Sequence, residues 1–525
     1  MTTVLLVRES RVSAPLLRFL EQELWGLPPW RLRMLSRPSE TSVVDHTNNL
    51  PRASAGSFQP VAGAPQPARI EGPSNPVETI AFGVGLVLLF LRTSMIHQLQ
   101  PVLMGFNLRL LYVFGLPALL GVVVVGGVQR SFRRRPAFYW AGFAVWMAVA
   151  TPFSAWRMGS VILFTGYLRT DLIMLFIIGG LVRSWQGCKL MMYAIAWGAV
   201  VNIFTGRLLG AEERFSGRLG LEFGSISNPN DFAGHLLFTL PFLLWVGLSA
   251  RSVVVRSAAL LGVFYGIYIV LMTGSRGAFL GLAVAALFFL FRGGASQRIA
   301  LLGLAPVVVM ILALFLPHQI WRHIRSFSAT SADADPGAIE SSETRQYTLR
   351  KSIEYTLQHP IVGVGPGQFA WYEGLNNRYG GTTHGFWHET HNTFTQVSSE
   401  CGIPAFILFL CGIISTFRLV NATYRQARPW PECKDIAVTA FCIMLAMVTF
   451  CTAIFFLSFA YFFYLPALAG LAIALDRTAR AEFTSRAAQV LEPPQPPWDG
   501  PSHGFRTGVG WTPAGLARAT QQTAS

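Results

Sequence analysis

The residues best suited to acid–base or metal chemistry lie together between positions 384 and 402. This stretch of nineteen residues holds three histidines and two glutamates, namely His384, His388, Glu389, His391 and Glu400. Imidazole is the one side chain whose unperturbed pKa lies near neutrality, so the cluster favours either proton transfer or metal binding. The spacing of the histidines and the rest of the chain bear on this choice.

Zinc binding is the first interpretation that the spacing suggests. His384, His388 and His391 stand at i, i+4 and i+7, which would place all three on one face of a helix. However, Gly385 interrupts that turn, and His388-Glu-Thr-His391 is one residue short of HExxH. We therefore favour acid–base chemistry and expect no metal, with His384 and His388 as interfacial or structural histidines. Glu400, nine residues after His391, is expected to brace this segment.

Two arginines are predicted to lie on the same side of a membrane as the histidines. Arg276 stands between two apolar runs, and Arg218 precedes the turn Asn228-Pro-Asn-Asp. An arginine in an otherwise apolar hairpin is costly unless it has a partner or lines a wet cavity. The alternative is an interfacial anchor, which we accept for Arg109 and Arg157. Glycines on both sides of Arg276 favour a ligand site there, because they permit a sharp turn and a close approach.

The chemistry of guanidinium indicates the class of ligand. Its planar fork gives permanently charged, bidentate hydrogen bonds, which suit a diphosphate. Arg218, Arg276 and a histidine on one membrane face therefore suggest a lipid-linked diphosphate substrate. The histidine would deprotonate an acceptor hydroxyl, and the arginines would offset charge on the leaving diphosphate. This reaction needs no metal or other cofactor.

The composition predicts an integral membrane protein. Of 525 residues, 52% are hydrophobic and only 13% are charged, and the mean hydropathy is +0.44. Lys and Arg outnumber Asp and Glu by 41 to 26, and they gather in short segments between apolar runs. This charge is typical of membrane orientation, so we expect contacts with membrane lipids and none with nucleic acid. The six cysteines form no CxxC pair and predict no disulfide framework.

The predicted fold is all-α, with about twelve transmembrane helices. Runs of spanning length recur from residue 79 onward, at about 79–96, 108–128, 137–153, 162–182, 188–205, 232–250, 253–273, 277–292, 299–317, 404–420, 436–456 and 458–475. Alternate loops carry the arginines, from Arg130 and Arg133 to Arg425 and Arg428, which predicts that these loops are cytoplasmic. Both termini are then inside, and the histidines lie outside.

Three regions follow from this pattern. Residues 1–78 are polar and rich in Arg, Pro and Ser, which predicts a flexible cytoplasmic extension. Residues 79–476 are predicted to form the membrane domain. It includes one large periplasmic loop at about 318–403, which contains short helices. One of these helices is expected at Glu343–Gln358, with Leu349, Ile353 and Leu357 on one face. Residues 477–525 are predicted to be a cytoplasmic tail that is disordered where it is rich in proline.

Four short motifs in this order resemble the O-antigen ligase and O-antigen polymerase superfamily. They are Asn228-Pro-Asn-Asp-Phe-Ala, Thr273-Gly-Ser-Arg-Gly-Ala-Phe-Leu-Gly, His359-Pro-Ile-Val-Gly-Val-Gly-Pro-Gly-Gln-Phe, and His391-Asn with the following Glu400-Cys-Gly. The resemblance covers about residues 81–476. It implies an inverting, metal-independent membrane glycosyltransferase, with an undecaprenyl-diphosphate-linked glycan as donor, in the bacterial inner membrane.

The resemblance also implies roles for particular residues. His391 matches the catalytic base, and Arg218 and Arg276 match the arginines that hold the donor diphosphate. Arg214 is a rival for Arg218, because the pattern there is loose, and Arg345 resembles a recurrent position with a donor-contacting or structural role. No counterpart of residues 1–78 is recognised in the family.

The acceptor separates three functional hypotheses. We favour an O-antigen ligase, which transfers the glycan to lipid A-core in lipopolysaccharide assembly, because of the Ser-Arg-Gly and His-Asn pair. An O-antigen or exopolysaccharide polymerase, whose acceptor is a growing glycan, shares the same motifs. A solute transporter is the alternative of another class, suggested by twelve spans with both termini inside. Against it, no pair of Gly- or Pro-broken spans stands in corresponding positions of two halves.

Overall fold

A computed structural model describes residues 75–212, 217–294, 298–299, 302–303, 336–376 and 387–491 of the chain. These residues belong to the second of two units into which the chain divides, Gln66–Ser525. Nearly all of the predicted N-terminal extension, most of the predicted ninth span, Arg214, His384 and the Pro-rich part of the tail lie outside the described residues.

The described part of the chain is built almost entirely of helices, which confirms the all-α prediction. The helices of the bundle are α2 (Pro76–Thr93), α4 (Leu110–Val124), α6 (Arg135–Ala150), α7 (Arg157–Gly166), α8 (Ile173–Leu181), α9 (Trp185–Leu208), α10 (Pro229–Ser249), α11 (Val253–Met272), α12 (Arg276–Arg292), α17 (Thr393–Ala427), α18 (Lys434–Ala453) and α19 (Tyr464–Leu491). The other helices are α3 (Ile96–Met104), α5 (Gly127–Ser131), α15 (Pro336–Gln358) and α16 (Phe369–Asn376), with a π segment at Tyr167–Leu172 and 3-10 turns at Thr151–Phe153, Pro431–Cys433 and Ile454–Phe456. Strands β1 (Gly210–Glu212) and β2 (Leu219–Leu221) pair antiparallel.

Eleven of the twelve predicted spans coincide with helices, and the other one lies mostly outside the described residues. Seven helical segments in the described ranges are long and apolar enough to cross a membrane, which supports a multi-pass protein. Two of them, Pro229–Ser249 and Pro431–Phe456, are largely buried within the bundle. The count of twelve spans stays a prediction.

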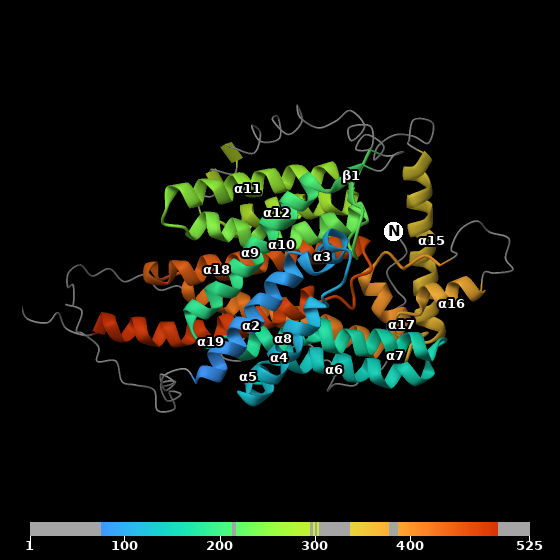
Figure 1. Cartoon of the computed structure of the whole chain (residues 1–525), viewed down its shortest axis with the longest axis horizontal. Coiled ribbons are helices and arrows are strands. Elements are labelled where there is room, and N and C mark those ends of the chain that lie inside the picture. The colour runs from blue at the N-terminus through green and yellow to red at the C-terminus, as the bar shows by residue number, and fades with distance from the viewer. Residues whose placement is uncertain are drawn as a thin grey trace, which may run out of the picture. The chain divides into compact units, whose positions relative to one another are not determined.

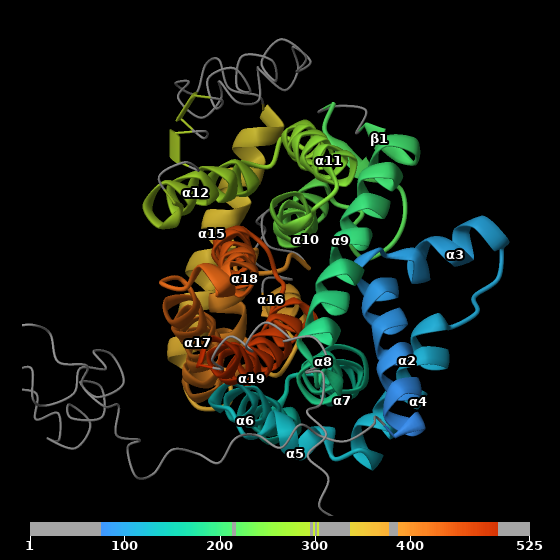
Figure 2. The same cartoon turned by 90° about the vertical axis from the view of Figure 1, so that its left-hand side faces the viewer.

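Helix α10 is the central helix of the bundle. Among the described elements it contacts α9, α11, α12 and α18, and Figure 2 shows it between these four helices. Phe232, Leu236, Phe238 and Phe242 on α10 are all almost fully buried. Apolar side chains on every face of α10 pack against the neighbouring helices. This packing fixes the position of its first residues relative to those helices.

Several element boundaries and one predicted face were wrong. The last span was expected at 458–475, but residues 457–463 precede α19, which begins at Tyr464 and continues to Leu491, through the start of the predicted tail. The predicted loop helix begins at Pro336 rather than at 343. Its apolar residues Leu349, Ile353 and Leu357 are exposed, at 38%, 49% and 71%.

The buried face of α15 is small and polar instead. It carries Thr348, Ser352 and Tyr355, and it packs on α17. Hydroxyls that bond to nearby carbonyl oxygens can be buried at little cost, so Thr348 and Ser352 fit this tight helix contact. Apolar spacing alone pointed to the wrong face of α15.

The basic loops that were predicted to share one side of the membrane are joined by ion pairs at one end of the bundle. Carboxylates of α2, α18 and α19 accept these arginines, in the pairs Glu78–Arg130 at 3.7 Å, Asp476–Arg134 at 2.6 Å, Asp476–Arg480 at 3.0 Å, Asp435–Arg486 at 2.9 Å, and Glu78–Arg183. Figure 1 shows the end of α19 at the left and α15 with α16 at the right. The basic loops thus lie opposite the histidine-rich segment.

Candidate active site

Arg218 is held between the end of α11 and the start of α10. It precedes β2, and its Nε donates to the carbonyl oxygen of Thr273 at 2.8 Å, while its guanidinium also donates to the Asn230 amide oxygen at 2.8 Å. Asn228 caps α10 by accepting from the backbone N–H of Asn230 at 2.8 Å, which fixes the start of that helix. The Asn-Pro-Asn motif thus has a physical role in positioning an arginine beside the turn between α11 and α12.

Arg276 begins α12 immediately after that turn. Gly274 has a φ of 60°, a backbone conformation that residues with a Cβ atom seldom adopt, so glycine allows α11 and α12 to meet in a three-residue connection. Gly277 faces the ring of Phe456, and a Cβ atom there would lie only 2.8 Å from a ring carbon. The two glycines that flank Arg276 therefore set the sharp turn and the close packing of α12.

Arg345 of α15 lies beside both of these arginines. Burial lowers the pKa of its guanidinium, and the charges of Arg218 and Arg276 lower it further, whereas Asp231 raises it. Three cations thus lie within electrostatic range of one another, and the Asp231 carboxylate also acts on Arg345. The arrangement is therefore suited to a multiply charged anion.

His391 lies in a non-helical segment that precedes α17. Residues 388–391 are not helical, and His391 has a φ of 50°. The zinc interpretation, which was not favoured, needs a helix through His388 and His391, and the described residues form none there. Helix α17 begins only at Thr393, because Asn392 accepts hydrogen bonds from the N–H groups of Phe394 and Thr395 and ends the preceding segment.

Ser458 holds His391 in this left-handed conformation. The backbone N–H of His391 donates to the Ser458 hydroxyl at 3.0 Å, and the same hydroxyl bonds to the Glu389 carboxylate. Thr393 fixes the segment further by donating to the carbonyl oxygen of Leu457 at 2.7 Å and accepting from the N–H of Phe459 at 2.9 Å. The segment before α19 thus positions the histidine from outside its own loop.

The electrostatic surroundings keep the His391 imidazole neutral. Burial lowers the pKa of His391 to about 4, with the positive charge of Arg345 as the next cause and His388 as a third. A neutral imidazole is the form that accepts a proton. At neutral pH His391 is therefore available as a base.

Two carboxylates complete the site. Asp231, in the first turn of α10, interacts electrostatically with Arg345. Glu389 is exposed. The protein atoms near its carboxylate nevertheless displace enough water to raise its pKa. Sequence reasoning quoted both residues within motifs but gave neither a role, and it missed Ser458, which stands in an apolar run and carries no local signal.

Glu400 braces the turn that leads into the site. Its carboxylate accepts from the N–H groups of Gly367 at 2.9 Å and Phe369 at 3.2 Å, and from the Tyr461 hydroxyl at 2.6 Å. Gly402 has a φ of 81°, and a Cβ atom there would collide with the carbonyl oxygen of Ile361. The motifs at residues 400–402 and 363–367 are therefore two segments that pack against each other.

The structure brings together four of the residues singled out in the sequence. The charges of Arg218 and Arg276 act on Arg345, and the charge of Arg345 acts on His391. Arg214 and His384 lie outside the described residues. Among the residues that are described, no group of three or more His, Cys, Asp or Glu side chains could hold a metal ion.

The fold and this site define a multi-pass helical membrane protein with a group of arginines beside a histidine at one end of its bundle. Residues 237–410 match the family model described as O-antigen ligase, which confirms the resemblance to the O-antigen ligase superfamily. The match begins within α10 and ends within α17, so it includes Arg276, Arg345, His391 and Glu400, and Arg218 lies before it. A search of the curated proteins found no match.

The family match also bears on the general function. It supports a membrane glycosyltransferase-like role in the assembly of O-antigen or another polysaccharide. A lipid-linked glycan and an acceptor are the general partners that such a role implies.

Proposed function

We propose that this protein transfers a glycan from an undecaprenyl-diphosphate-linked donor to lipid A-core, as an O-antigen ligase of the bacterial inner membrane. The observation that supports the proposal is the electrostatic proximity of Arg218 and Arg276 to Arg345, with His391 next to Arg345 in turn. Arginines on three different elements would grip a diphosphate from several directions through charge-assisted hydrogen bonds.

The proposed reaction is a single displacement. The acceptor hydroxyl oxygen attacks the anomeric carbon of the donor, and His391 takes the hydroxyl proton. The bond between that carbon and the diphosphate oxygen breaks, and its electron pair leaves with the diphosphate. One displacement inverts the configuration at the carbon. Arg218 and Arg276 offset the charge that develops on the leaving group.

Donor binding would also prepare the base. With a pKa of about 4, His391 is a weak proton acceptor, and part of the cause is the charge of Arg345. A diphosphate bound among the arginines would counter that charge and raise the pKa of His391 towards neutrality, where a general base works best. The base would therefore become effective only when the donor is in place.

The proposed orientation places this site in the periplasm. The basic loops at the other end of the bundle would face the cytoplasm, with both termini on that side, residues 1–78 as an N-terminal extension and 477–525 as a tail. A lipid-linked donor that has crossed the membrane would then meet the arginines at the outer surface.

The decisive experiment compares acceptors with the purified protein. Turnover of the lipid-linked donor would be measured with lipopolysaccharide lacking O-antigen and, separately, with a second donor molecule, and the His391→Ala variant would serve as the blank. We expect transfer to the lipopolysaccharide core. Transfer only to a second donor would identify a polymerase, and donor-independent solute uptake would instead favour a transporter.

A further inference from the structure

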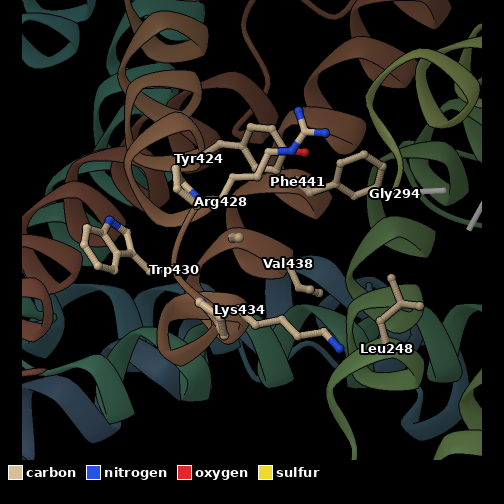
Figure 3. A pocket seen from close by; sticks show the side chains of 11 residues that line it. Leu248, Gly294, Tyr424, Arg428, Trp430, Lys434, Val438 and Phe441 are labelled. Atoms are coloured by element: carbon tan, nitrogen blue, oxygen red, sulfur yellow. The ribbon is translucent and has the colours of Figure 1, made fainter. Parts of the chain in front are cut away.

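A cavity lies at the end of the bundle opposite His391. It is enclosed by the end of α10, the residues that follow α12, the end of α17 and the start of α18, and it has a volume of about 360 Å³ (Figure 3). Helix α17 has its N-terminal end beside His391 and its C-terminal end at this cavity. A kink at Gly402 divides it, and the helical part from Ile403 to Ala427 alone spans roughly 40 Å. The cavity is therefore separate from the candidate active site.

The inner wall of the cavity is apolar and rigid. Tyr424 and Phe441 are only 7% and 4% exposed. The Tyr424 hydroxyl donates to the carbonyl oxygen of Arg292 at 3.0 Å, which ties α17 to the end of α12. The Phe441 ring lies with its centre 5.0 Å from that of Phe289 and 5.5 Å from that of Phe288. These contacts keep a cavity open within the size range of small-molecule sites, about 300–1,000 Å³.

Two cations stand at the rim of this apolar wall. Arg428 and Lys434 both line the cavity (Figure 3), and both are exposed. Within the described ranges neither forms an ion pair, and the only contact of Arg428 with a charged or aromatic group is with the Tyr424 ring, whose centre lies 6.0 Å from its guanidinium carbon. The neighbouring Asp435 is already engaged by Arg486 and by the Trp185 indole.

The surroundings are those of a membrane interface. Trp430 at the cavity is 62% exposed, and tryptophan is enriched where hydrocarbon meets the polar headgroups. Val253 and Val254, at the start of the neighbouring α11, are 75% and 77% exposed, as expected for side chains that face lipid. Basic pockets between membrane helices on the cytoplasmic side are suited to anionic headgroups.

We propose that this cavity binds one anionic phospholipid. The phosphate lies at the mouth of the cavity in the positive field of Arg428 and Lys434, whose charged ends point to opposite sides of it (Figure 3), and the glycerol and the first part of an acyl chain lie against Leu248, Val438 and Phe441. A free phosphate shares the anionic chemistry, but it would leave the apolar wall unused. This site does not depend on the proposed glycosyl transfer, because it lies at the other end of α17.

The test is lipid retention by the full chain, measured by native mass spectrometry in detergent with added phosphatidylglycerol. The Arg428→Gln/Lys434→Gln double variant is compared with Arg251→Gln/Arg256→Gln, which removes two exposed cations near the start of α11, outside the cavity. We expect phosphatidylglycerol to bind about 10- to 30-fold more weakly to the first pair and unchanged to the second. The charge-retaining Arg428→Lys variant should keep binding, which separates lost charge from lost folding.

Three results would overturn the proposal. Equal losses in both double variants would mean that the lipid responds only to net charge. Full retention by Arg428→Gln/Lys434→Gln would mean that the lipid binds elsewhere. Displacement of phosphatidylglycerol by millimolar inorganic phosphate, or equal binding of the zwitterionic phosphatidylethanolamine, would remove the anionic lipid as the ligand.

Discussion

At the scale of single residues, the site couples a histidine to an arginine. Arg345 both belongs to the arginine group and lowers the pKa of His391. In the proposed mechanism, the same charge that attracts an anionic donor adds to burial in keeping the His391 imidazole neutral before the donor arrives. This coupling makes the roles of His391, Arg345 and the other arginines separable by experiment.

We expect His391→Ala to reduce glycan transfer by about 10²- to 10⁴-fold, the usual contribution of a general base, with unchanged amounts of protein in the membrane. His388→Ala and His384→Ala should be milder. Transfer rates and membrane abundance of the three variants, with the metal content of the wild-type protein, provide the measurement. Comparable losses in all three variants together with stoichiometric zinc and inhibition by chelators would instead establish a metal site.

Lysine substitutions separate a diphosphate ligand from an interfacial anchor. Arg218→Lys and Arg276→Lys keep the charge but lose the planar fork, so transfer should fall by about 10- to 100-fold in kcat/KM. Arg157→Lys is the control, because Arg157 is an exposed residue at the start of α7. Kinetics against donor concentration give the result. Near-normal values for both Arg218→Lys and Arg276→Lys would remove the reason for a diphosphate at this position.

The pH dependence of transfer tests the link between Arg345 and His391. In the proposed mechanism the neutral imidazole is the active form, so we expect kcat/KM to fall as the pH drops through the pKa of His391 in the free enzyme, about 4. Arg345→Gln removes a positive charge, so the pKa of His391 rises and the acidic limb moves to higher pH. Burial, the larger cause, remains, so the pKa should stay below its ordinary value.

The midpoint of the acidic limb, rather than the height of the profile, is the quantity to compare. Lys351→Gln on the same helix is the matched control, because Lys351 already pairs with Glu354 at 3.0 Å, and it should leave the midpoint in place. A profile of Arg345→Gln that is lower but not displaced would show that Arg345 acts only on donor binding.

At the scale of elements, the site is assembled where segments distant in sequence meet. The segment at 457–460 positions Thr393 and His391, and α17 with the turn at 360–367 forms the brace around Glu400. Helix α15 is joined to α16 through Glu373, which is fully buried and accepts from the hydroxyls of Tyr347 and Tyr355. Rigid supports of this kind hold catalytic groups in one geometry.

The brace predicts unequal effects of its two side chains. Glu400→Ala leaves the N–H groups of Gly367 and Phe369 without their acceptors, so we expect a loss of about 3–5 kcal/mol in unfolding free energy. Tyr461→Phe removes one hydroxyl and should cost only about 1 kcal/mol. Thermal unfolding of the purified variants provides the comparison, and equal destabilisation by the two substitutions would contradict the bracing role.

At the scale of the whole molecule, the arginine-rich loops and the candidate site occupy opposite ends of the helices. Because alternate loops carry the arginines, the positive-inside rule assigns the site to the outer face. The ion pairs show that these loops lie together at one end of the bundle. Which side of the membrane that end faces is a matter for measurement.

Cysteine labelling provides that measurement in a chain whose six native cysteines are replaced. Arg350→Cys on α15 and Glu432→Cys in the α17–α18 connection both change exposed residues. In intact spheroplasts, a membrane-impermeant maleimide should label the first, and it should label the second only after permeabilisation. The reverse pattern would place His391 in the cytoplasm and would contradict a periplasmic glycosyl transfer.

The sequence by itself determined the features that depend on local composition. Apolar runs long enough to span a membrane predicted the helices, since burying backbone polar groups in lipid requires helical hydrogen bonding. The short motifs identified Arg276 and His391, because they contain the glycine and the asparagine that shape the turns around these residues. Boundaries were less accurate, as at α19, since helix ends depend on capping and packing.

Only the tertiary structure decided which residues meet. The approach of Arg345 to Arg218 and Arg276 joins elements more than sixty residues apart, and no local pattern encodes such a contact. The support of His391 by Ser458 depends on a hydroxyl in an apolar run. The buried face of α15 is polar because hydrogen bonds to α17 and its loop, rather than hydrophobicity, determine how this helix packs. Contacts of this kind arise from the packing of the whole bundle, which residue spacing along one helix does not contain.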